Sequence, residues 1–480
     1  MKYIDKSVLN YIVYIYILGK TIAKVGHIMN VNLESKEQEI LNLLNEKKMS
    51  QLKDLLVELK PVDIADIVDE LDEAEAIVVF RLLPKELAVE VFSCFEMEKQ
   101  KKIAELITAK ELNELISDLY FDDMIDLLEE MPAEIVSDVL QNTAPDQRKL
   151  INQFLAYPPH SAGALMTIEF VELSPEWTVR EGIEHVRDVG LTKETIYTCY
   201  VINKTKKLLG ILSLRELVTA DLDLIIEDIM DEDVITVNTH DDQEDVADTL
   251  KRYGFLALPV VDNNYRLTGI ITFDDIIDVI EDEATEDFQK MAAMTPSEEA
   301  YLDLSVFALA KHRVLWLLIL MVSATFTGAI IEGYQDTLDR LTILSAFIPM
   351  LMDTGGNAGS QSSTLIIRGL ATGDIETRDF LKVLWKEIRV AVICGIVLSA
   401  VNFGRLVMIN KLATPIAFAV SVTLVCTVLM AKIVGSMLPM IAEKLKLDPA
   451  IMAGPLITTI VDAGALIIYF KLATSMLHLI

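Results

Sequence analysis

The feature that most constrains this 480-residue chain is a series of long apolar segments in its last third. An α-helix rises about 1.5 Å per residue, so each segment is long enough to cross a hydrocarbon core about 30 Å thick. We therefore predict that residues 313–480 form an α-helical membrane domain in the lipid bilayer. Its five transmembrane helices are expected near residues 314–332, 341–367, 390–409, 415–441 and 450–471.

The net negative charge of the chain lies outside this apolar region. Residues 311–480 contain 14 basic residues (Lys and Arg) and 11 acidic residues (Asp and Glu). The first 310 residues contain 28 basic and 62 acidic residues. Such acidity argues against nucleic acid or anionic lipid as a partner, and it suits a cation-rich interface. A surface that is acidic only for solubility is the alternative interpretation.

Basic residues are distributed unevenly between the two ends of the predicted spans, and the richer side is expected to be cytoplasmic. That side has Lys311, Arg313, Arg368, Arg378, Lys382, Lys386, Arg389, Lys444 and Lys446, and the other has Arg340, Lys411 and Lys471. We predict a multi-pass protein of the cell (inner or plasma) membrane, with a cytoplasmic N-terminus and an extracellular C-terminus. Lys432, inside the fourth span, is interpreted as snorkelling to the cytoplasmic edge.

Residues 1–32 do not fit the pattern of the rest. Their apolar run YIVYIYIL is too short to span a bilayer, and no small-residue cleavage site follows it. We interpret this stretch as an N-terminal extension of uncertain role, with Met29 as an alternative start.

Residues 33–160 predict an acidic, all-α helical repeat domain. The segments PVDIADIVDEL, FDDMIDLLEEMP and PAEIVSDVLQ each combine acidic residues with an apolar helical stripe. Recurrence of this kind favours a stack of short helices. Pro61, Pro84, Pro132 and Pro145 stand where helices should start.

Residues 161–222 and 223–284 predict two copies of one α/β unit. LLGILSLREL in the first copy matches LTGIITFDDI in the second. Each copy has the pattern of a strand, a helix, two β-branched strands around a turn and a closing helix. The pair resembles a tandem cystathionine-β-synthase (CBS) module. Residues 285–312, charged and then mixed, predict a connecting (plug) helix that leads to the membrane domain.

Asp462 lies near the middle of the last predicted span, in DPAIMAGPLITTIVDAGALIIYF. A carboxylate at that depth costs several kcal/mol unless it faces water, a cation or a partner. One interpretation is a structural aspartate bonded to a neighbouring helix. The small residues around it, and Pro455, which frees a backbone carbonyl, favour a pore for hydrated Mg²⁺ instead.

The second predicted span contains a run of small and polar residues after Asp353, in FIPMLMDTGGNAGSQSSTLIIRGLATG. Such a run cannot face lipid. Asn357, Gln361 and Thr364 recur at helical spacing, so one face of the helix is polar. This segment is expected to form a tight helix crossing, a pore wall, or both.

The motifs TGGNAGSQSSTLIIRGLATGD and DPAIMAGPLITTIVDAGALIIYF resemble the MgtE family of bacterial magnesium channels and transporters. That family has an N-terminal helical domain, two CBS domains, a connecting helix and five spans, the order seen here from about residue 33 onward. The resemblance implies a homodimeric Mg²⁺-selective channel, not an enzyme. It also implies passive Mg²⁺ uptake that stops when Mg²⁺ binds the cytoplasmic acidic domains.

The resemblance implies functional residues as well. The pore metal residues are Asp462, Thr458 through its backbone carbonyl, and Asn357. ATP is the expected regulatory ligand of the CBS pair, at Tyr197, Arg215 and Phe255. The regulatory Mg²⁺ ligands, from FDDMID and DDIIDVIEDEATED, are Asp122, Asp126, Asp275, Asp278, Glu283, Glu286 and Asp287.

The residues themselves support the regulatory assignment, because carboxylates three apart share a helix face and repel one another unless a cation screens them. A solvated acidic face is the alternative. The chain departs from the family at Gly254, where members can carry an acidic residue, so one ligand is expected to be missing. Asp241, Asp242 or Asp245 are the candidate substitutes.

Two rival functions remain at this level. A secondary antiporter would exchange Mg²⁺ with Na⁺ or H⁺ through Asp462 or Asp353. A nucleotide-sensing membrane regulator would transport nothing.

Overall fold

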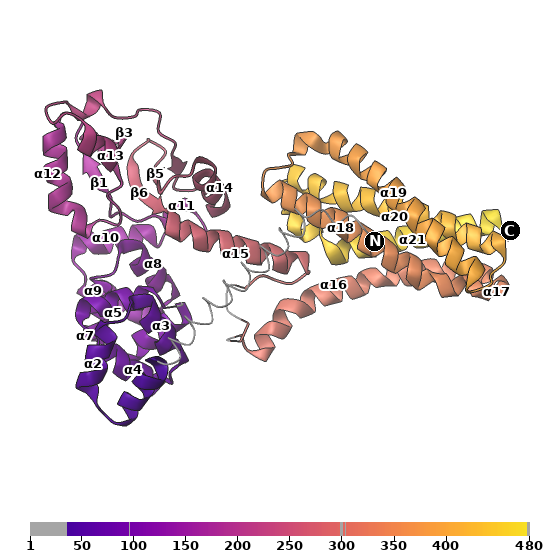
Figure 1. The fold of residues 1–480 in the computed structure, drawn as a ribbon, viewed down its shortest axis with the longest axis horizontal. Coiled ribbons are helices and arrows are strands. Elements are labelled where there is room, and N and C mark those ends of the chain that lie inside the picture. Colours follow the sequence, from indigo (N-terminus) through magenta and orange to yellow (C-terminus); the bar gives the residue numbers. More distant parts are fainter. Residues whose placement is uncertain (1–35, 96, 298–300, 303, 478–480) are drawn as a thin grey trace, which may run out of the picture. The chain divides into compact units, whose positions relative to one another are not determined.

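The computed structural model describes residues 36–95, 97–297, 301–302 and 304–477. The chain divides into two compact units, Met1–Val279 and Ile280–Ile480 (Figure 1). The predicted multi-domain fold class is confirmed, because short helices are followed by two small sheets with their helices and then by long apolar helices. The predicted extension 1–32 lies outside the described residues.

Short helices joined by tight turns form the described chain as far as residue 155. Pro61 and Pro145 lie in the first turns of α3 and α10, and Pro84 and Pro132 are the N-caps of α5 and α9, as predicted. Proline is tolerated there because the first N–H groups of a helix have no intrahelical partner. After a helical stretch at 36–45, the helices are α2 (Met49–Val57), α3 (Pro61–Glu70), α4 (Glu73–Leu82), α5 (Lys85–Ser93), α6 (Met97–Leu106), α7 (Ala109–Ile116), α8 (Phe121–Glu130), α9 (Ala133–Asn142) and α10 (Pro145–Phe154).

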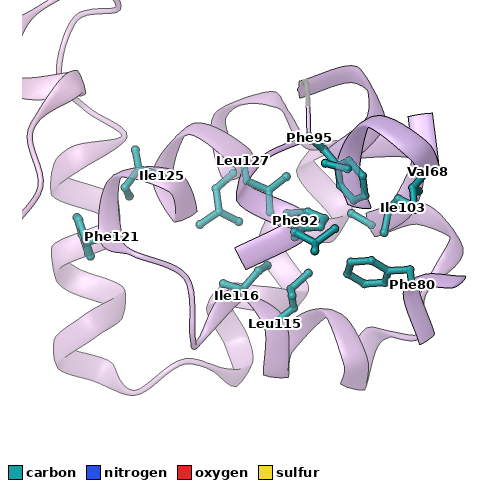
Figure 2. Packing of buried hydrophobic residues seen from close by; sticks show 14 of the residues in the cluster. Val68, Phe80, Phe92, Phe95, Ile103, Leu115, Ile116, Phe121, Ile125 and Leu127 are labelled. Atoms are coloured by element: carbon teal, nitrogen blue, oxygen red, sulfur yellow. The ribbon is translucent and has the colours of Figure 1, made fainter. Parts of the chain in front are cut away.

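The apolar faces of these helices meet in a shared core (Figure 2). The rings of Phe80, Phe92 and Phe95 pack against one another, and their centroids are 6.1–6.3 Å apart. Ile103 and Leu115 belong to the same buried cluster. Helices of about ten residues are marginal alone in water, so this shared burial is what stabilises them.

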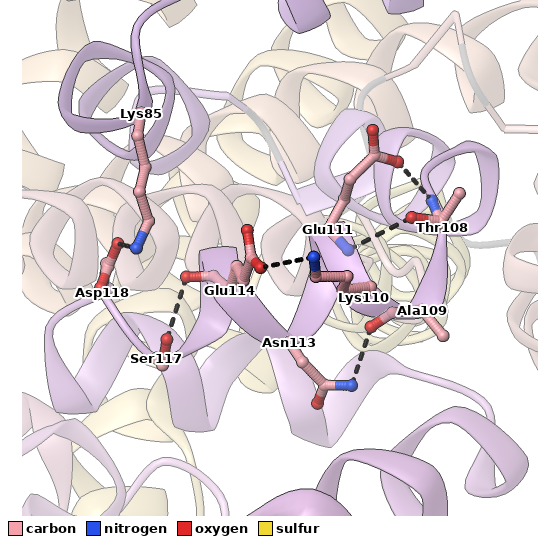
Figure 3. A network of polar contacts seen from close by, with 9 residues as sticks. All are labelled: Lys85, Thr108, Ala109, Lys110, Glu111, Asn113, Glu114, Ser117 and Asp118. Carbon is pink, nitrogen blue, oxygen red and sulfur yellow. Dashed lines mark hydrogen bonds and ion pairs between the residues drawn. The ribbon is translucent and has the colours of Figure 1, made fainter.

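Polar contacts on the outside connect α5 and α7 (Figure 3). At the start of α7, Thr108 Oγ1 accepts a hydrogen bond from the Glu111 N–H, and Glu111 Oε2 accepts one from the Thr108 N–H. Lys85 of α5 pairs with Asp118 just after α7. The cap contributes about 1 kcal/mol, whereas the exposed ion pair contributes less.

The next region contains two three-stranded sheets with the same topology. In each, the first strand pairs parallel with the second, and the second pairs antiparallel with the third. The first copy contains α11 (Ala162–Leu165), β1 (Val171–Leu173), α12 (Val179–Val189), η1 (Gly190–Thr192), β2 (Thr198–Ile202), β3 (Leu208–Ser213) and α13 (Leu214–Thr219). The second contains η2 (Ile226–Asp228), β4 (Val237–Asn238), α14 (Gln243–Tyr253), β5 (Ala257–Val261), β6 (Leu267–Thr272) and α15 (Phe273–Met291).

The matched glycines of the two copies lie where the backbone of the other copy crosses. A methyl group on Gly210 would lie 2.8 Å from the Asp231 carbonyl oxygen, and one on Gly269 would lie 2.6 Å from that of Thr167. A side chain at either position would separate the two copies, which accounts for the repeated glycine in LLGILS and LTGIIT.

The connector is not the single helix that residues 285–312 predict. Helix α15 ends at Met291, and Ala293 has a φ of 54°, in the left-handed region that ends helices. Gln289 and Ser297 then exchange two hydrogen bonds of 2.8 and 3.0 Å across the turn. A new helix begins only after Ser305, whose hydroxyl accepts from the Ala308 N–H.

Five long helices, joined by short helical segments, form most of the described remainder of the second unit, and each predicted span includes most of one long helix. They are α16 (Val306–Gly333), α17 (Gln335–Arg340), η3 (Thr342–Phe347), α18 (Ile348–Ala371), η4 (Thr377–Asp379), α19 (Phe380–Met408), α20 (Thr414–Lys444), η5 (Pro449–Met452) and α21 (Gly454–Met476). Among the described residues, four helical stretches are long and apolar enough to cross a membrane: Val306–Gly333, Thr377–Met408, Thr414–Lys444 and Pro449–Met476. Helix α18 is outside these four because polar and small residues fill its middle.

Helix α18 packs closely against α20 and α21 through its glycines. A methyl group on Gly435 of α20 would lie 2.2 Å from the Gly359 carbonyl oxygen, and one on Gly356 would lie 2.9 Å from Thr458 Cγ2 of α21. Small residues permit such close backbone approach. The resulting van der Waals packing stabilises the helix pair, because in lipid there is no hydrophobic driving force between helices.

Gly435→Ala is expected to destabilise the membrane helices by at least 1–3 kcal/mol, roughly the cost of overpacking a tight contact. The detergent-purified variant should melt several degrees below the parent protein. Gly404→Ala on α19 is the matched control, because nothing lies within 4 Å of the added methyl group. Equal melting temperatures for the two variants would contradict the tight crossing of α18 and α20.

Candidate metal sites

An acidic cluster lies on α8 in the first unit and contains two predicted regulatory residues. Burial, followed by the charges of Asp275 and Asp123, raises the pKa of Asp122 well above its ordinary value. Asp126 reaches solvent, yet desolvation of its carboxyl and the nearby Asp123 raise its pKa to about 7. Burial also raises the pKa of Asp123 to about 6. The fold therefore gathers like charges in a poorly solvated place, where a cation would relieve their repulsion.

Glu194, just before β2, joins this cluster, although sequence reasoning missed it. Burial, then the charges of Asp275 and Asp274, raises the pKa of Glu194 to about 7. Its Oε2 atom is buried and has no hydrogen-bond partner. No motif marks Glu194, since it comes near α8 and α15 only through tertiary folding. Asp123, by contrast, stands inside the FDDMID motif and was open to inference.

Asp275 and Asp278, at the start of α15, differ in their surroundings. Asp275 Oδ2 accepts a hydrogen bond from Thr272 Oγ1, while burial raises the pKa of its carboxyl. Asp278 is exposed and lies near enough to add its charge to that effect. The predicted pair is thus brought together, with one member facing Asp122 and the other solvent.

A second acidic cluster lies at the end of α15, in the second unit. Lys290 Nζ is 2.7 Å from Glu286 Oε2 and 2.7 Å from Asp448 Oδ2, just before η5. Burial, then the charge of Asp448, raises the pKa of Asp287 to about 6, and Glu283 adds to the effect. Lys290 and Asp448 were missed from the sequence, because they lie far apart in the chain.

These clusters offer carboxylate oxygens as their possible metal ligands. Among the described residues, no three His, Cys, Asp or Glu side chains converge closely enough to hold a metal ion directly. Carboxylate oxygens are nevertheless the donors that Mg²⁺ prefers, and Mg²⁺ usually retains several waters. The buried, unpartnered Glu194 oxygen is the kind of acceptor that a bound water could serve.

The predicted pore residues lie on α18 and α21, which pack together. Asp462 Oδ1 is buried and has no hydrogen-bond partner, so this oxygen is not bonded to a neighbouring helix. Thr458 Oγ1 donates to the Gly454 carbonyl oxygen at 2.8 Å. Thr458 also contacts Gly356, the neighbour of Asn357, and Asp353 lies within electrostatic range of the Asp462 carboxylate.

Helix α18 has two contrasting faces. Its exposed face carries Asp353, Asn357, Gln361, Thr364 and Arg368, whereas Gly355, Gly359, Ser362 and Ser363 are buried on the opposite side. The polar spacing read from the sequence therefore describes a real, exposed stripe. A stripe of this composition needs water or protein, because lipid cannot satisfy it.

The residues predicted to bind ATP separate into two places. The Tyr197 carbonyl oxygen accepts a hydrogen bond from the Leu214 N–H, which places Tyr197 beside Arg215, and both side chains are exposed. Phe255 instead lies in the second CBS copy, where it stacks on Tyr253 with ring centroids 5.5 Å apart. The bond between Leu214 and Tyr197 therefore brings the segments of Tyr197 and Arg215 together, whereas Phe255 lies in the other copy.

Gly254 has a structural reason to replace an acidic residue. It ends α14 with a φ of 68°, a conformation that favours glycine. Two of the three candidates for the missing acidic ligand already form local hydrogen bonds. Asp241 accepts from the Asn238 N–H, and Asp242 caps α14. Burial and the charge of Asp242 raise the pKa of Asp245, which leaves it the better candidate.

Three sequence profiles of known families match the chain. They are the MgtE divalent cation transporter over residues 348–472, the MgtE intracellular N domain over 59–160, and the CBS domain over 162–223 and 226–282. The chain is 38% identical over 408 residues to the magnesium transporter MgtE of Thermus thermophilus, covering 84% of this chain and 89% of that protein. It is 35% identical over 357 residues to the magnesium transporter MgtE of Bacillus subtilis, covering 74% and 78%.

Among solved structures, the soluble part of a magnesium transporter matches with a TM-score of 0.49 and 33% identity, over 52% of this chain and 99% of that one. The cytosolic domain of the Mg²⁺ channel MgtE in complex with ATP matches with a TM-score of 0.49 and 35% identity, over 51% and 99%. The extent and identity of the Thermus match, together with the three profiles, establish the family. The chain belongs to the MgtE family of magnesium transporters, which are not enzymes.

Proposed function

We propose that this multi-pass membrane protein is a homodimeric Mg²⁺-selective channel for passive Mg²⁺ uptake, closed by Mg²⁺ bound to its acidic clusters. The observation that carries the proposal is the Asp462 carboxylate in the last membrane helix, with an oxygen that is buried and unpartnered. An isolated carboxylate there needs a compensating cation. A passing hydrated Mg²⁺ supplies that charge without a permanent partner.

The ion path is proposed to run between α18 and α21. Asn357 provides an amide on the exposed stripe of α18, and the backbone carbonyl of Thr458 provides a second neutral oxygen near Asp462. Neutral oxygens and one carboxylate can hold the water shell of Mg²⁺ without stripping it, so the ion binds weakly enough to leave.

A second copy of the chain is proposed to complete the path. In one chain the polar stripe of α18 is exposed, although it lies on a helix of the membrane unit. Two copies that face each other through this stripe would enclose it and remove it from lipid, and a two-fold arrangement is the commonest for identical chains.

Closure is proposed to depend on differential Mg²⁺ binding to two states of the acidic domains. Asp122, Asp126, Glu194 and Asp275 repel one another when no cation is present, and bound Mg²⁺ favours the arrangement that keeps them together. A ligand shifts such an equilibrium only through its different affinity for the two states. The clusters on α15, which continues into the membrane unit, are the proposed link to the pore: Asp275, Asp278, Glu283, Glu286 and Asp287.

The proposed orientation keeps the acidic domains and the N-terminus in the cytoplasm, since basic residues accumulate on that side of the five spans. ATP is proposed as a second regulatory ligand, which stacks on Tyr197 and pairs with Arg215. Both side chains are exposed, and the backbone bond from Leu214 to Tyr197 brings their chain segments together, which supports a nucleotide site in the first CBS copy.

Exchange of Mg²⁺ for Na⁺ or H⁺ is the alternative that one observation favours. Asp353 lies within electrostatic range of Asp462, and membrane carboxylates in such pairs can serve as carrier sites. Recordings from purified protein in bilayers separate the two functions. Single-channel currents support a channel, whereas a fixed ratio of exchanged ions supports an antiporter.

Asp462→Asn is expected to lower Mg²⁺ uptake into proteoliposomes at least about tenfold, because the ion path then lacks the negative charge that attracts Mg²⁺. Asp336→Asn, an exposed carboxylate of α17, removes the same charge outside the proposed path and should leave uptake unchanged. Normal uptake by the Asp462 variant would refute the pore assignment.

The double variant Asp275→Ala/Asp278→Ala is expected to keep taking up Mg²⁺ when internal Mg²⁺ is millimolar, where the parent protein closes. Flux should be compared at low and at millimolar internal Mg²⁺. Asp221→Ala/Asp228→Ala changes the net charge equally at two exposed positions and should close normally. Normal closure of the first variant would exclude this pair as a sensor.

Glu194→Gln is expected to raise the melting temperature of the Mg²⁺-free protein at pH 8. Folding raises the pKa of Glu194 to about 7, so the folded state binds the proton more tightly and loses stability as pH rises from about 4.5 to 7. Glutamine removes that loss. The gain should shrink at pH 5 and on adding Mg²⁺, and a gain independent of both would contradict the electrostatic account.

A further inference from the structure

Lys432 is a buried cation within helix α20. It is 6% exposed, and its Nζ donates a hydrogen bond to Ser362 Oγ of α18 at 3.1 Å. Helix α20 continues from Lys432 to Lys444, a rise of about 18 Å that exceeds the reach of a lysine side chain. The interpretation of Lys432 as a snorkelling residue is therefore wrong.

The Ser362 hydroxyl connects this cation to an anion on a third helix. Ser362 Oγ donates to Glu387 Oε2 of α19 at 2.7 Å while it accepts from Lys432. A hydroxyl has one proton and two lone pairs, so Ser362 can accept from the ammonium while it donates to one acceptor. Glu387 Oε2 at 2.7 Å is the closer acceptor, and the Ala358 carbonyl oxygen lies at 3.4 Å. Opposite charges on α20 and α19 thus compensate each other through α18.

The chain of bonds lies beside the closest contact between α18 and α20. Ser362 is one turn after Gly359, and Lys432 is one turn before Gly435, the two glycines whose backbones meet. The opposite face of the same stretch of α18 carries Asn357 and Gln361. A rotation of α18 that moved those amides would also withdraw the Ser362 hydroxyl from Lys432 and Glu387.

Charged groups make this restraint stronger than neutral ones would. Hydrogen bonds to ionised partners are roughly twice as strong as neutral ones. An ammonium that loses its partner away from water is strongly disfavoured, so few orientations of α18 are tolerated. A glycine contact alone restricts the rotation of the helix less, because glycine has no side chain that forms orientation-specific bonds.

We propose that Lys432, Ser362 and Glu387 form a charge-compensated positioning relay that sets the rotation of α18 and thereby places Asn357 and Gln361 toward the transported ion. The relay rests on the proposed function in one respect, that α18 lines the ion path. The three residues act through the helix, and their removal alters which divalent cation passes best.

The test compares Lys432→Met, Glu387→Gln and the double variant in two measurements. The first is the melting temperature in detergent, and the second is the ratio of Mg²⁺ to Co²⁺ uptake by proteoliposomes. Lys444→Met and Glu443→Gln are the matched controls, since both residues are exposed at the end of the same helix α20.

Each single variant should lower the melting temperature and change the uptake ratio by about threefold to tenfold. The double variant should melt closer to the parent than either single variant, because no unpaired charge is left. The controls should change neither quantity. Ser362→Ala, which keeps both charges and cuts the bridge, should reproduce the altered ratio if a charge-removing variant does not fold.

Additive losses in the double variant would overturn the relay. Recovered melting temperatures with an unchanged uptake ratio in every variant would overturn its positioning role, because charge compensation would then be only structural. Asp462→Asn, measured in parallel, tests the ion path separately: its normal uptake would refute the proposed pore while the melting temperatures still report on the relay.

Discussion

The structure depends on carboxylates held away from water with too few cations of the protein's own to neutralise them. The chain carries a net charge of −31, and folding concentrates part of it at α8, at both ends of α15 and in α21. Ordinary acidic surfaces spread their charge into solvent. Here burial raises the pKa of Asp122 and Glu194, so an added divalent ion changes the free energy of these places more than it would at an exposed surface.

Helix α18 shows how one segment serves two environments. Its glycines allow the backbone of α20 to approach, and Ser362 connects it to charges on both neighbouring helices. Its other face keeps Asp353, Asn357 and Gln361 exposed. Close packing on one side is what permits a polar stripe on the other, since a loosely packed helix would turn its polar groups inward to find partners.

Helix α15 carries acidic residues at both of its ends, although the chain divides into units at residue 279. Asp275 belongs to the charged cluster of the first unit, and Glu286 and Asp287 belong to that of the second. The helix stops at Met291 because Ala293 takes a left-handed conformation. The helix therefore does not continue unbroken into α16, which the charged and then mixed composition of residues 285–312 did not reveal.

Most residues of the candidate sites were implied by the resemblance of the chain's motifs to the MgtE family. The sequence by itself determined the apolar helices, the repeated α/β unit and the proline-initiated short helices. Those features are periodic or local, so spacing along the chain is enough to read them. Glu194, Lys290, Asp448 and the partner of Lys432 were decided only by the tertiary structure. Lys432 and Ser362 are 70 residues apart, and no spacing rule predicts which buried polar groups will meet. Contacts of that kind follow from how helices pack, which depends on all their side chains together.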